Sequence, residues 1–237
     1  MPFLSTTVGC FGPAADVAAN GLVLGGPVDA AFSGLAQPFE AGVVLARPVS
    51  FTDLESNLVP DADAVWLNLD GAPVELANED NGLYIYDAQI QPTVRYAPGA
   101  SVEVHAHVDG EEGVATVTAP QPPDLSMIPA THPAGASLVV EMAEEFALVY
   151  GAVVDTQGFV VWEDRPQTTE EIILQLRDAG SVERYMFPAD AFPGAGNYGL
   201  ALVGIRTADG PDFQGFERFW SNFGVGAIGT GYIAITP

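Results

Sequence analysis

The chain has no lysine, and its only basic side chains are seven arginines among 237 residues. Against them stand 31 aspartates and glutamates, which give a formal net charge of −24 at pH 7. Binding to nucleic acid or to anionic lipid headgroups requires a basic surface. The composition therefore excludes nucleic acid as a partner, and it excludes an anionic membrane surface unless a lipid anchor provides the attachment. A cationic partner, a neutral glycan or a divalent metal ion remains possible, as does a charge that only keeps the protein soluble.

Cysteine is nearly absent, since Cys10 is the only one, and no disulfide can form within the chain. The segment Thr7-Val8-Gly9-Cys10 is similar to the end of a bacterial lipoprotein signal, whose cysteine carries the lipid. It departs from that pattern because no basic residue precedes it and Thr7 replaces the usual leucine. Cys10 is therefore the lipidation candidate. The alternatives are a start upstream of Met1, which would complete the signal, and a chance match.

Residues 1–35 are rich in glycine and alanine and show little periodicity. This composition favours a flexible leader that tethers a folded domain. The alternative is an irregular first strand around residues 22–24 that packs on the following domain.

Residues 36–122 show the alternation of a half-buried antiparallel sheet. Within residues 101–109, for example, four apolar side chains (Val102, Val104, Ala106 and Val108) line one face. Glycine, proline and aspartate turns separate these short segments, as in Asp70-Gly71 and in residues 110–113. The pattern predicts an antiparallel β-sandwich.

This half resembles the transthyretin-like and carboxypeptidase-regulatory-like modules of secreted bacterial proteins. The matching pieces are Val65-Trp66-Leu67-Asn68-Leu69-Asp70-Gly71, Gly82-Leu83-Tyr84, Pro98-Gly99 and Val117-Thr118-Ala119-Pro120. The resemblance covers about residues 38–122, and it implies a non-enzymatic module that supports or binds another molecule.

Three prolines in Ala119-Pro120-Gln121-Pro122-Pro123 form a stiff linker, so we place a domain boundary between residues 122 and 123. In the second half, Thr168 and Glu171 have the spacing of a capping box, and apolar residues follow at helical intervals. Residues 181–205 read as strand, turn and strand, with Tyr198 pinning the corner where the second strand begins.

This second half, residues 123–237, resembles fibronectin-III-like or immunoglobulin-like modules that are fused in tandem in bacterial surface lipoproteins. The pieces that carry the resemblance are Val161-Trp162-Glu163-Asp164-Arg165-Pro166, Phe187-Pro188-Ala189-Asp190-Ala191-Phe192 and Gly196-Asn197-Tyr198. The predicted fold is thus mainly β, with two antiparallel β-sandwich domains in tandem and one short helix in the second.

Glu103, His105 and His107 project from one face of the strand predicted over residues 101–109. A His-x-His pair with a carboxylate is an arrangement that binds zinc in several β-folds. Further ligands are needed, and the only other histidine, His132, lies beyond the proline linker. The alternative is the solvent-facing side of a half-buried strand. No cofactor is expected, although zinc remains possible at this face. Calcium remains possible at the acidic turns, which are residues 61–63, 78–81, 109–112 and 209–212.

No motif of nucleophilic or metalloprotease catalysis is present, and no phosphate-binding loop follows a strand. Four side chains are candidates for a binding surface that stacks on a glycan or contacts a protein: Trp162, Phe216, Arg218 and Trp220. The alternative is that the aromatic residues close the core of the second domain.

These features predict a non-enzymatic binding or structural protein, extracellular or on the outer surface of a bacterial cell envelope, with a protein or glycan ligand. One alternative is a metal-binding protein or metalloenzyme centred on the His-x-His strand. Another is a structural subunit of a filament or of a viral or phage particle, which would pack through its edge strands.

Overall fold

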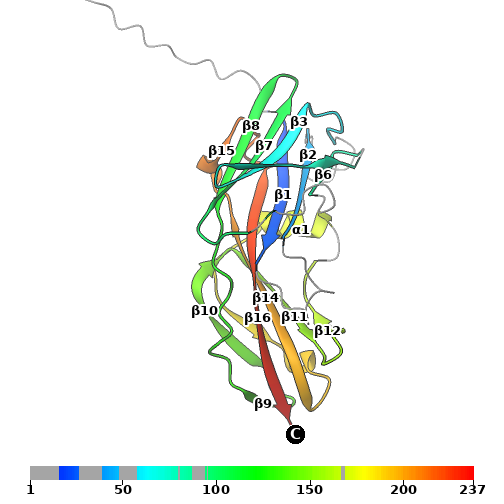
Figure 1. The fold of residues 1–237 in the computed structure, drawn as a ribbon, viewed down its shortest axis with the longest axis vertical. Helices are drawn as coiled ribbons and strands as arrows, with labels where there is room; N and C mark the ends of the chain where they lie inside the picture. The colour runs from blue at the N-terminus through cyan, green and yellow to red at the C-terminus, as the bar shows by residue number, and fades with distance from the viewer. Residues whose placement is uncertain are drawn as a thin grey trace, which may run out of the picture.

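The residues that the structure describes form an elongated body built of three β-sheets and one α-helix (Figure 1). The computed structural model describes residues 16–26, 39–47, 58–79, 81–86, 94, 96–166 and 169–237. In this part of the chain no helix has the length and apolar character needed to cross a membrane. The prediction of a mainly β protein with one short helix is confirmed.

The largest sheet has nine strands and runs along most of the body (Figure 1). Its strands, in spatial order, are β12 (Val160–Glu163), β11 (Leu148–Val154), β14 (Gly196–Thr207), β16 (Asn222–Thr236), β1 (Ala18–Gly25), β2 (Phe39–Ala46), β6 (Leu83–Ile85) and β5 (Ala77–Asn78). The ninth strand, β9 (Thr131–Pro133), pairs with the end of β16.

Two smaller sheets cover different parts of the nine-stranded sheet. The five-stranded sheet contains β15 (Phe213–Gln214), β8 (Glu111–Thr118), β7 (Ser101–Val108), β3 (Ala64–Leu69) and β4 (Ala72–Glu75). The two-stranded sheet pairs β10 (Leu138–Phe146) with β13 (Val182–Phe187). In β7 the four residues expected on the apolar face are buried and alternate with more exposed ones, which confirms the period-2 prediction.

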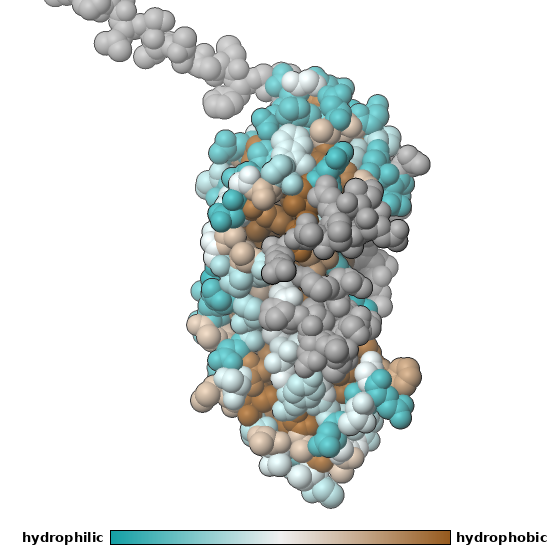
Figure 2. All heavy atoms as spheres, viewed as in Figure 1, coloured by the Kyte–Doolittle hydropathy of each residue, from teal (hydrophilic) through white to brown (hydrophobic). Residues whose placement is uncertain are grey.

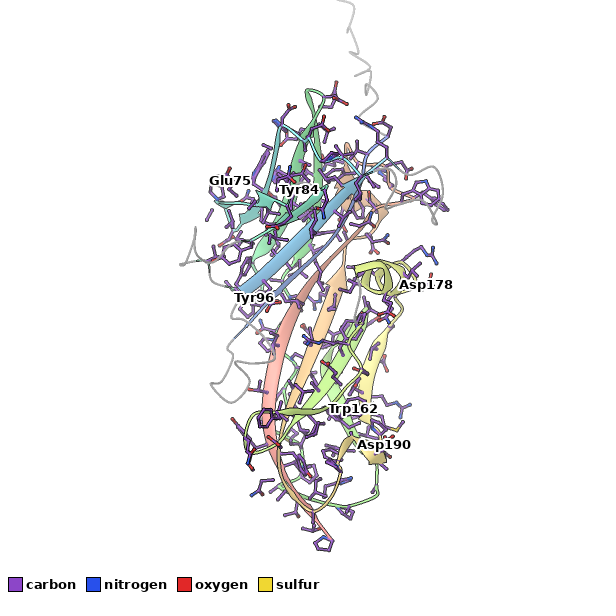
Figure 3. All side chains as sticks on the ribbon, turned by 90° about the vertical axis from the view of Figure 1, so that its right-hand side faces the viewer. Glu75, Tyr84, Tyr96, Trp162, Asp178 and Asp190 are labelled. Atoms are coloured by element: carbon purple, nitrogen blue, oxygen red, sulfur yellow. The ribbon has the colours of Figure 1, made fainter. Side chains whose placement is uncertain are left out.

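Two separate hydrophobic cores result. The first core lies between the five-stranded sheet and strands β1, β2 and β6, and it includes Val23, Leu67 and Tyr84. The second core lies between the two-stranded sheet and strands β11 and β14, and Trp162 packs at its margin. Tyr84 and Trp162 accordingly lie in opposite halves of the body (Figure 3). Hydrophobic residues also gather separately in the upper and the lower half of the face that Figure 2 shows.

Strand β16 belongs to both cores. Its first part carries Phe223 and Val225 into the first core, and its last part carries Ile233 and Ile235 into the second. The strand pairs with β14 along most of its length, antiparallel, and with β1 in parallel over its first six residues. Backbone hydrogen bonding in the nine-stranded sheet is therefore continuous from one core to the other.

Part of the segment expected to be a flexible leader is a strand in the middle of this sheet. Residues 18–25 form β1, which is buried between β2 and β16. Most of β1 is buried, and apart from Asn20 it consists of apolar residues and glycine, so it lacks the alternation of a half-buried strand. The alternative, a first strand around residues 22–24, describes this part better. Residues 1–15 of the expected leader lie outside the described residues.

The tandem arrangement of two independent sandwiches is not confirmed. The nine-stranded sheet takes β1, β2, β5 and β6 from before the expected boundary at residues 122 and 123, and its other five strands from after it. Each core has its own second layer, but the two cores share one sheet. The prolines of the expected linker mark a change of layer and do not separate the hydrogen-bonded sheets.

Residues 181–205 form the expected strand, turn and strand, but the two strands do not pair with each other. Strand β13 pairs with β10, whereas β14 pairs with β11 and β16. The connection therefore crosses the second core from one layer to the other. The Tyr198 hydroxyl donates a hydrogen bond to the carbonyl oxygen of Gly194 over 3.1 Å, so the predicted tyrosine pin is present.

The predicted helix is α1 (Thr169–Arg177), which packs on the face of the nine-stranded sheet that points away from the cores. Leu176 is buried there against Tyr150 and Ile205. The predicted cap, Thr168, lies outside the described residues. The helix sits near the middle of the long axis, beside the region where the two cores meet (Figure 1).

Because both cores share β16, we expect damage to either core to destabilise the whole molecule in one transition. Phe223 is fully buried, and Phe223→Ala should lower the free energy of unfolding by about 3–5 kcal/mol. The measurement is urea unfolding, followed by far-UV circular dichroism and tryptophan fluorescence. Trp66 and Trp162 report on opposite halves of the body. Because both halves share β16, circular dichroism and fluorescence should give one common midpoint.

Tyr232→Ala is the matched control, since it lies on the same strand with 56% of the residue exposed, and it should cost less than about 1 kcal/mol. Two separated transitions, of which Phe223→Ala moves only one, would show that the cores are independent domains.

Candidate functional site

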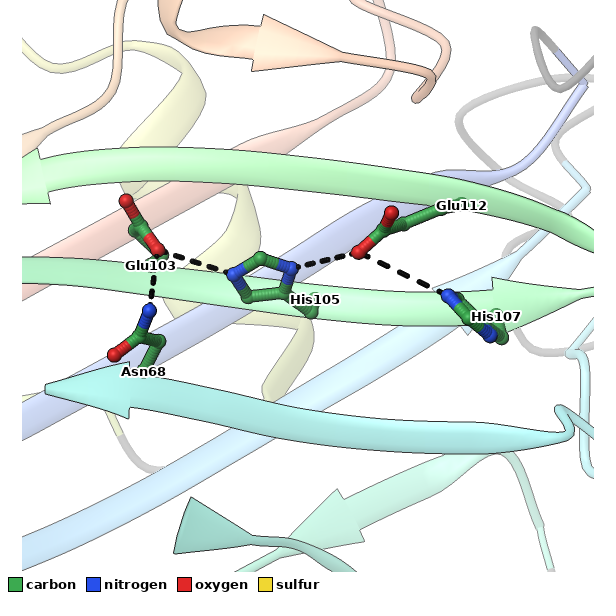
Figure 4. Close-up of polar contacts among 5 residues, drawn as sticks. All are labelled: Asn68, Glu103, His105, His107 and Glu112. Atoms are coloured by element: carbon green, nitrogen blue, oxygen red, sulfur yellow. Dashed lines mark hydrogen bonds and ion pairs between the residues drawn. The ribbon is translucent and has the colours of Figure 1, made fainter. Parts of the chain in front are cut away.

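A strip of polar and aromatic side chains lies on the outward face of the five-stranded sheet (Figure 4). Its centre is His105 on β7, which stands opposite Trp66 on β3 and Val114 on β8. Residues of β7 alternate between the first core and this outward face, so Glu103, His105 and His107 share the outward side. The expectation that these three residues lie on one face is therefore confirmed.

The His105 ring is held between two carboxylates. Its Nε2 atom lies 3.1 Å from Glu103 Oε2, and its Nδ1 atom lies 3.0 Å from Glu112 Oε1. Neutral imidazole has only one N–H, so both contacts are hydrogen bonds only when the ring is the doubly protonated cation. In that form His105 forms two charge-assisted hydrogen bonds, which fix the plane of the ring.

Neighbouring side chains extend this arrangement in both directions (Figure 4). Asn68 Nδ2 donates a hydrogen bond to Glu103 Oε2 over 2.8 Å. At the other end Glu112 Oε1 lies 3.8 Å from His107 Nε2, which is an ion-pair distance when His107 is protonated. We call these five residues together with Trp66 the acidic–aromatic strip.

Trp66 supplies the aromatic surface of the strip. Its ring stacks on His105 with centroids 4.8 Å apart and planes 11° from parallel. It also meets His107 edge-on at 5.2 Å. The His105 side chain is only 15% exposed, whereas those of His107 and Glu112 are nearly half exposed. The strip thus combines a fixed centre with groups that reach solvent.

The predicted metal ligands are already engaged with one another. Among the described residues no group of three or more histidine, cysteine or acidic side chains is arranged to hold a metal ion. A zinc ion bound to His105 would have to displace the Glu103 or Glu112 contact, because both ring nitrogens face carboxylates. Zinc binding, the alternative that the sequence left open, would therefore require the His105 ring to rearrange.

The acidic turns proposed for calcium also have partners within the chain. Asp109 pairs with Arg47, which in turn contacts Asp16. Asp209 and Asp212 cap each other's backbone N–H groups in a short 3₁₀ helix. These contacts engage Asp109, Asp209 and Asp212 within the chain, so a calcium ion at either turn would have to compete with them.

The four residues predicted to form a binding surface do not lie together. Phe216 is buried in the first core, where its ring packs against Gly113, while Trp162 packs on Phe187 of the second core with centroids 5.9 Å apart. Trp220 contacts the exposed Phe219, and Arg218 Nε donates to the Phe213 carbonyl oxygen. The alternative of a second-domain core fits Trp162, which packs at the margin of the second core, whereas Phe216 is a core residue of the first core instead. The lipidation candidate, Cys10, lies outside the described residues.

Sequence reasoning did not place Trp66 and Asn68 in the site, and it considered Glu112 only as a nearby carboxylate of the hairpin turn. The sequence does contain a local signal for Glu112, which is the Asp109-Gly110 dipeptide. Both residues adopt the positive φ that a two-residue hairpin turn requires. That turn sets Glu112 opposite His107. Trp66 and Asn68 arrive through the pairing of β3 with β7, which is not local, and no sequence spacing predicts it.

A second polar cluster lies at the margin of the second core. The Tyr185 hydroxyl donates to Asp164 Oδ2 over 2.5 Å, while Asp164 Oδ1 accepts from the Gly151 N–H. Burial raises the pKa of Tyr185 well above its usual range, and the Asp164 carboxylate adds to the effect. Burial likewise raises the pKa of Tyr150 to about 12.

Comparison with known proteins identifies no family. No protein-family model matches the chain, and no curated protein matches it either. A solved structure of a 1.5-MDa bacterial ice-binding adhesin, described for its retention on the host cell surface, is similar over 92% of this chain and 65% of that one. The sequence identity is 8% and the TM-score 0.25. A TM-score this low does not establish a common fold, so function has to be inferred from this chain's own residues.

Stability should fall at alkaline pH because of the buried tyrosines. Above pH 10 the unfolded chain loses tyrosine protons that the folded protein keeps, so the folded state becomes less favoured as the pH rises towards about 12. We expect Tyr185→Phe to make this decline shallower, by up to about 1.4 kcal/mol per pH unit. Urea unfolding at pH 7, 10 and 11 measures it. The difference at pH 7 gives the stability that is lost with the hydrogen bond of Tyr185. Parallel pH profiles of wild type and variant would contradict the assignment of the alkaline decline to Tyr185.

Zinc and calcium should leave the melting temperature unchanged within about 1 °C, because the acidic–aromatic strip is already satisfied internally. Thermal unfolding of metal-free protein, with and without each ion, is the measurement. The double variant His105→Gln/His107→Gln serves as the control and should behave in the same way. A zinc-dependent rise in the wild type that disappears in the double variant would establish a metal site there.

Proposed function

We propose that the protein is a non-enzymatic binding protein of the bacterial cell envelope or extracellular space, and that the acidic–aromatic strip binds a neutral glycan. The observation that supports this proposal is the stacked pair of Trp66 and His105 on an outward sheet face, flanked by the Glu103 and Glu112 carboxylates 3.1 and 3.0 Å from the ring nitrogens of His105. Sugars present apolar C–H faces and a rim of hydroxyl groups. A planar ring beside fixed acceptors is complementary to both.

The position of the strip favours binding without large rearrangement. Its residues stand on β3, β7 and β8, which are paired strands whose other face fills the first core. Side chains held by a packed sheet and by mutual hydrogen bonds lose little conformational freedom when a ligand arrives. The side chains of His107 and Glu112 are 46% and 48% exposed, against 15% for His105 and 30% for Glu103, so His107 and Glu112 supply the first contacts with hydroxyl groups.

The net charge of the protein favours neutral glycans over anionic ones. At a net charge of −24 the protein repels polyanions at long range, so uronic-acid or sulfated polysaccharides are disfavoured. The carboxylates of the strip accept hydrogen bonds from neutral sugar hydroxyls without that penalty. A lipid attached at Cys10 would hold the protein at the cell surface, in keeping with an envelope location.

The test is affinity electrophoresis and titration calorimetry with a panel of neutral and anionic polysaccharides. Trp66→Ala should weaken binding to the neutral ligand at least about tenfold, since a stacking ring is worth roughly 1.4 kcal/mol or more. His105→Gln keeps a polar side chain but loses the paired carboxylate contacts, and it should weaken binding less.

Phe219→Ala is the matched control, because Phe219 is an exposed aromatic residue outside the strip. It should bind as the wild type does. Failure of every neutral glycan to bind, or equal losses from Trp66→Ala and Phe219→Ala, would contradict the proposal.

A further inference from the structure

The face of the nine-stranded sheet that points away from the cores carries an apolar groove beside α1. Two cavities of about 340 and 270 Å³ lie along it, and they share Leu22, Leu24, Glu40 and Ile172 in their walls. They are therefore neighbouring parts of one groove. Its floor comes mainly from β1, β2, β11 and β14, and Ile172 of α1 forms part of its side. A space of this size matches a small organic ligand.

The alternation of β1 and β2 explains why the groove is apolar. Val23, Val43 and Leu45 enter the first core, so Leu22, Leu24 and Val44, which alternate with them, must face the other way. Apolar side chains on both faces suit a strand that is covered on both faces. Here the helix covers one part of the second face, and the groove occupies the adjoining part.

Two buried hydrogen-bond donors in the groove walls lack acceptors. Asn20 is 1% exposed and lines the smaller cavity; its Oδ1 accepts from Asn222 Nδ2, while its own Nδ2 has no partner. Tyr150 is 8% exposed and lines the larger cavity, and its hydroxyl has no partner either. Leaving such a group unsatisfied costs about 1–3 kcal/mol, so two beside one groove call for an explanation.

We propose that this groove binds a neutral acyl compound, whose chain lies along the leucines and whose carbonyl or hydroxyl oxygens accept hydrogen bonds from Asn20 and Tyr150. Both donors are uncharged groups, and they suit ester, amide or hydroxyl oxygens. The site is distinct from the acidic–aromatic strip, which is on another sheet, so either proposal can fail without the other.

The charged residues at the groove argue for a neutral ligand over a fatty-acid anion. Glu40 is exposed and lines both cavities. Arg165 lines the larger one, but its Nε atom is 2.6 Å from Glu163 Oε2, so its charge is already balanced. Glu40, Glu163 and Arg165 are two carboxylates and one guanidinium, so they add a net negative charge at the groove of a chain that carries −24, and a carboxylate ligand is disfavoured.

The test uses monodecanoylglycerol as the probe and decanoate as its anionic counterpart, measured by titration calorimetry and native mass spectrometry on the full chain. We expect one equivalent of monodecanoylglycerol to bind, and decanoate to bind at least about tenfold more weakly. Tyr150→Phe should weaken monodecanoylglycerol about fivefold to tenfold, the value of one hydrogen bond. Its melting temperature at neutral pH should not fall, because the hydroxyl that it removes has no partner in the free protein.

Gly42→Leu is the blocking variant. Gly42 lines the smaller cavity, and a Cβ atom there has no neighbour within 4 Å, so the leucine side chain starts in open space and extends into the groove. Gly194→Leu, at an equally open glycine outside the groove walls, is its control. Gly42→Leu should abolish binding and Gly194→Leu should preserve it.

Three results would overturn the inference. These are no binding of monodecanoylglycerol to the wild type, binding that Gly42→Leu leaves intact, and equal affinity for decanoate. A Tyr150→Phe variant that loses stability but keeps its affinity would show that the hydroxyl serves the fold and not the ligand.

Discussion

The parallel pairing of β1 with β16 is the interaction on which the rest of the structure depends. Six residues of β1 lie beside the first six of β16, and β1 also pairs with β2 along its whole length. Through these bonds the strands of the first core join those of the second in one sheet. Without β1, the sheet would end at Asn222–Thr236 on one side, and the first core would lose the layer that faces the five-stranded sheet.

The same pairing makes the fold dependent on distant parts of the chain. The Ala19 N–H donates to Ser221 Oγ, across 202 positions of sequence. Closing so long a loop costs entropy before the contacts form, so we expect the nine-stranded sheet to be completed late in folding. The β7–β8 hairpin and the two-stranded sheet of β10 and β13 need much shorter closures. They are the natural candidates for early structure.

What could be predicted from the sequence follows the same division between local contacts and contacts that join distant segments. Short-range patterns predicted the buried face of β7, the helix at residues 169–177 and the shared orientation of Glu103 and His105, because these depend on local geometry. The position of Trp66 over His105 and the shared sheet depend on strand pairing between distant segments, which one sequence does not encode in any readable spacing. Since the pairing partners of residues 18–25 cannot be read from the sequence, the small residues in this segment favoured a flexible tether. It also suits a strand squeezed between two others.

The orientation of β1 against β16 has a mechanical consequence. The chain enters β1 at the end where β16 begins, and β16 leaves the body at the opposite end (Figure 1). A pull between the two ends of the folded chain would therefore slide these strands along each other and load their hydrogen bonds all at once. Strands pulled apart from one end break their bonds in succession, at lower force. A protein that holds a ligand against flow while fixed near its N-terminus would be strained along the direction in which this sheet resists most.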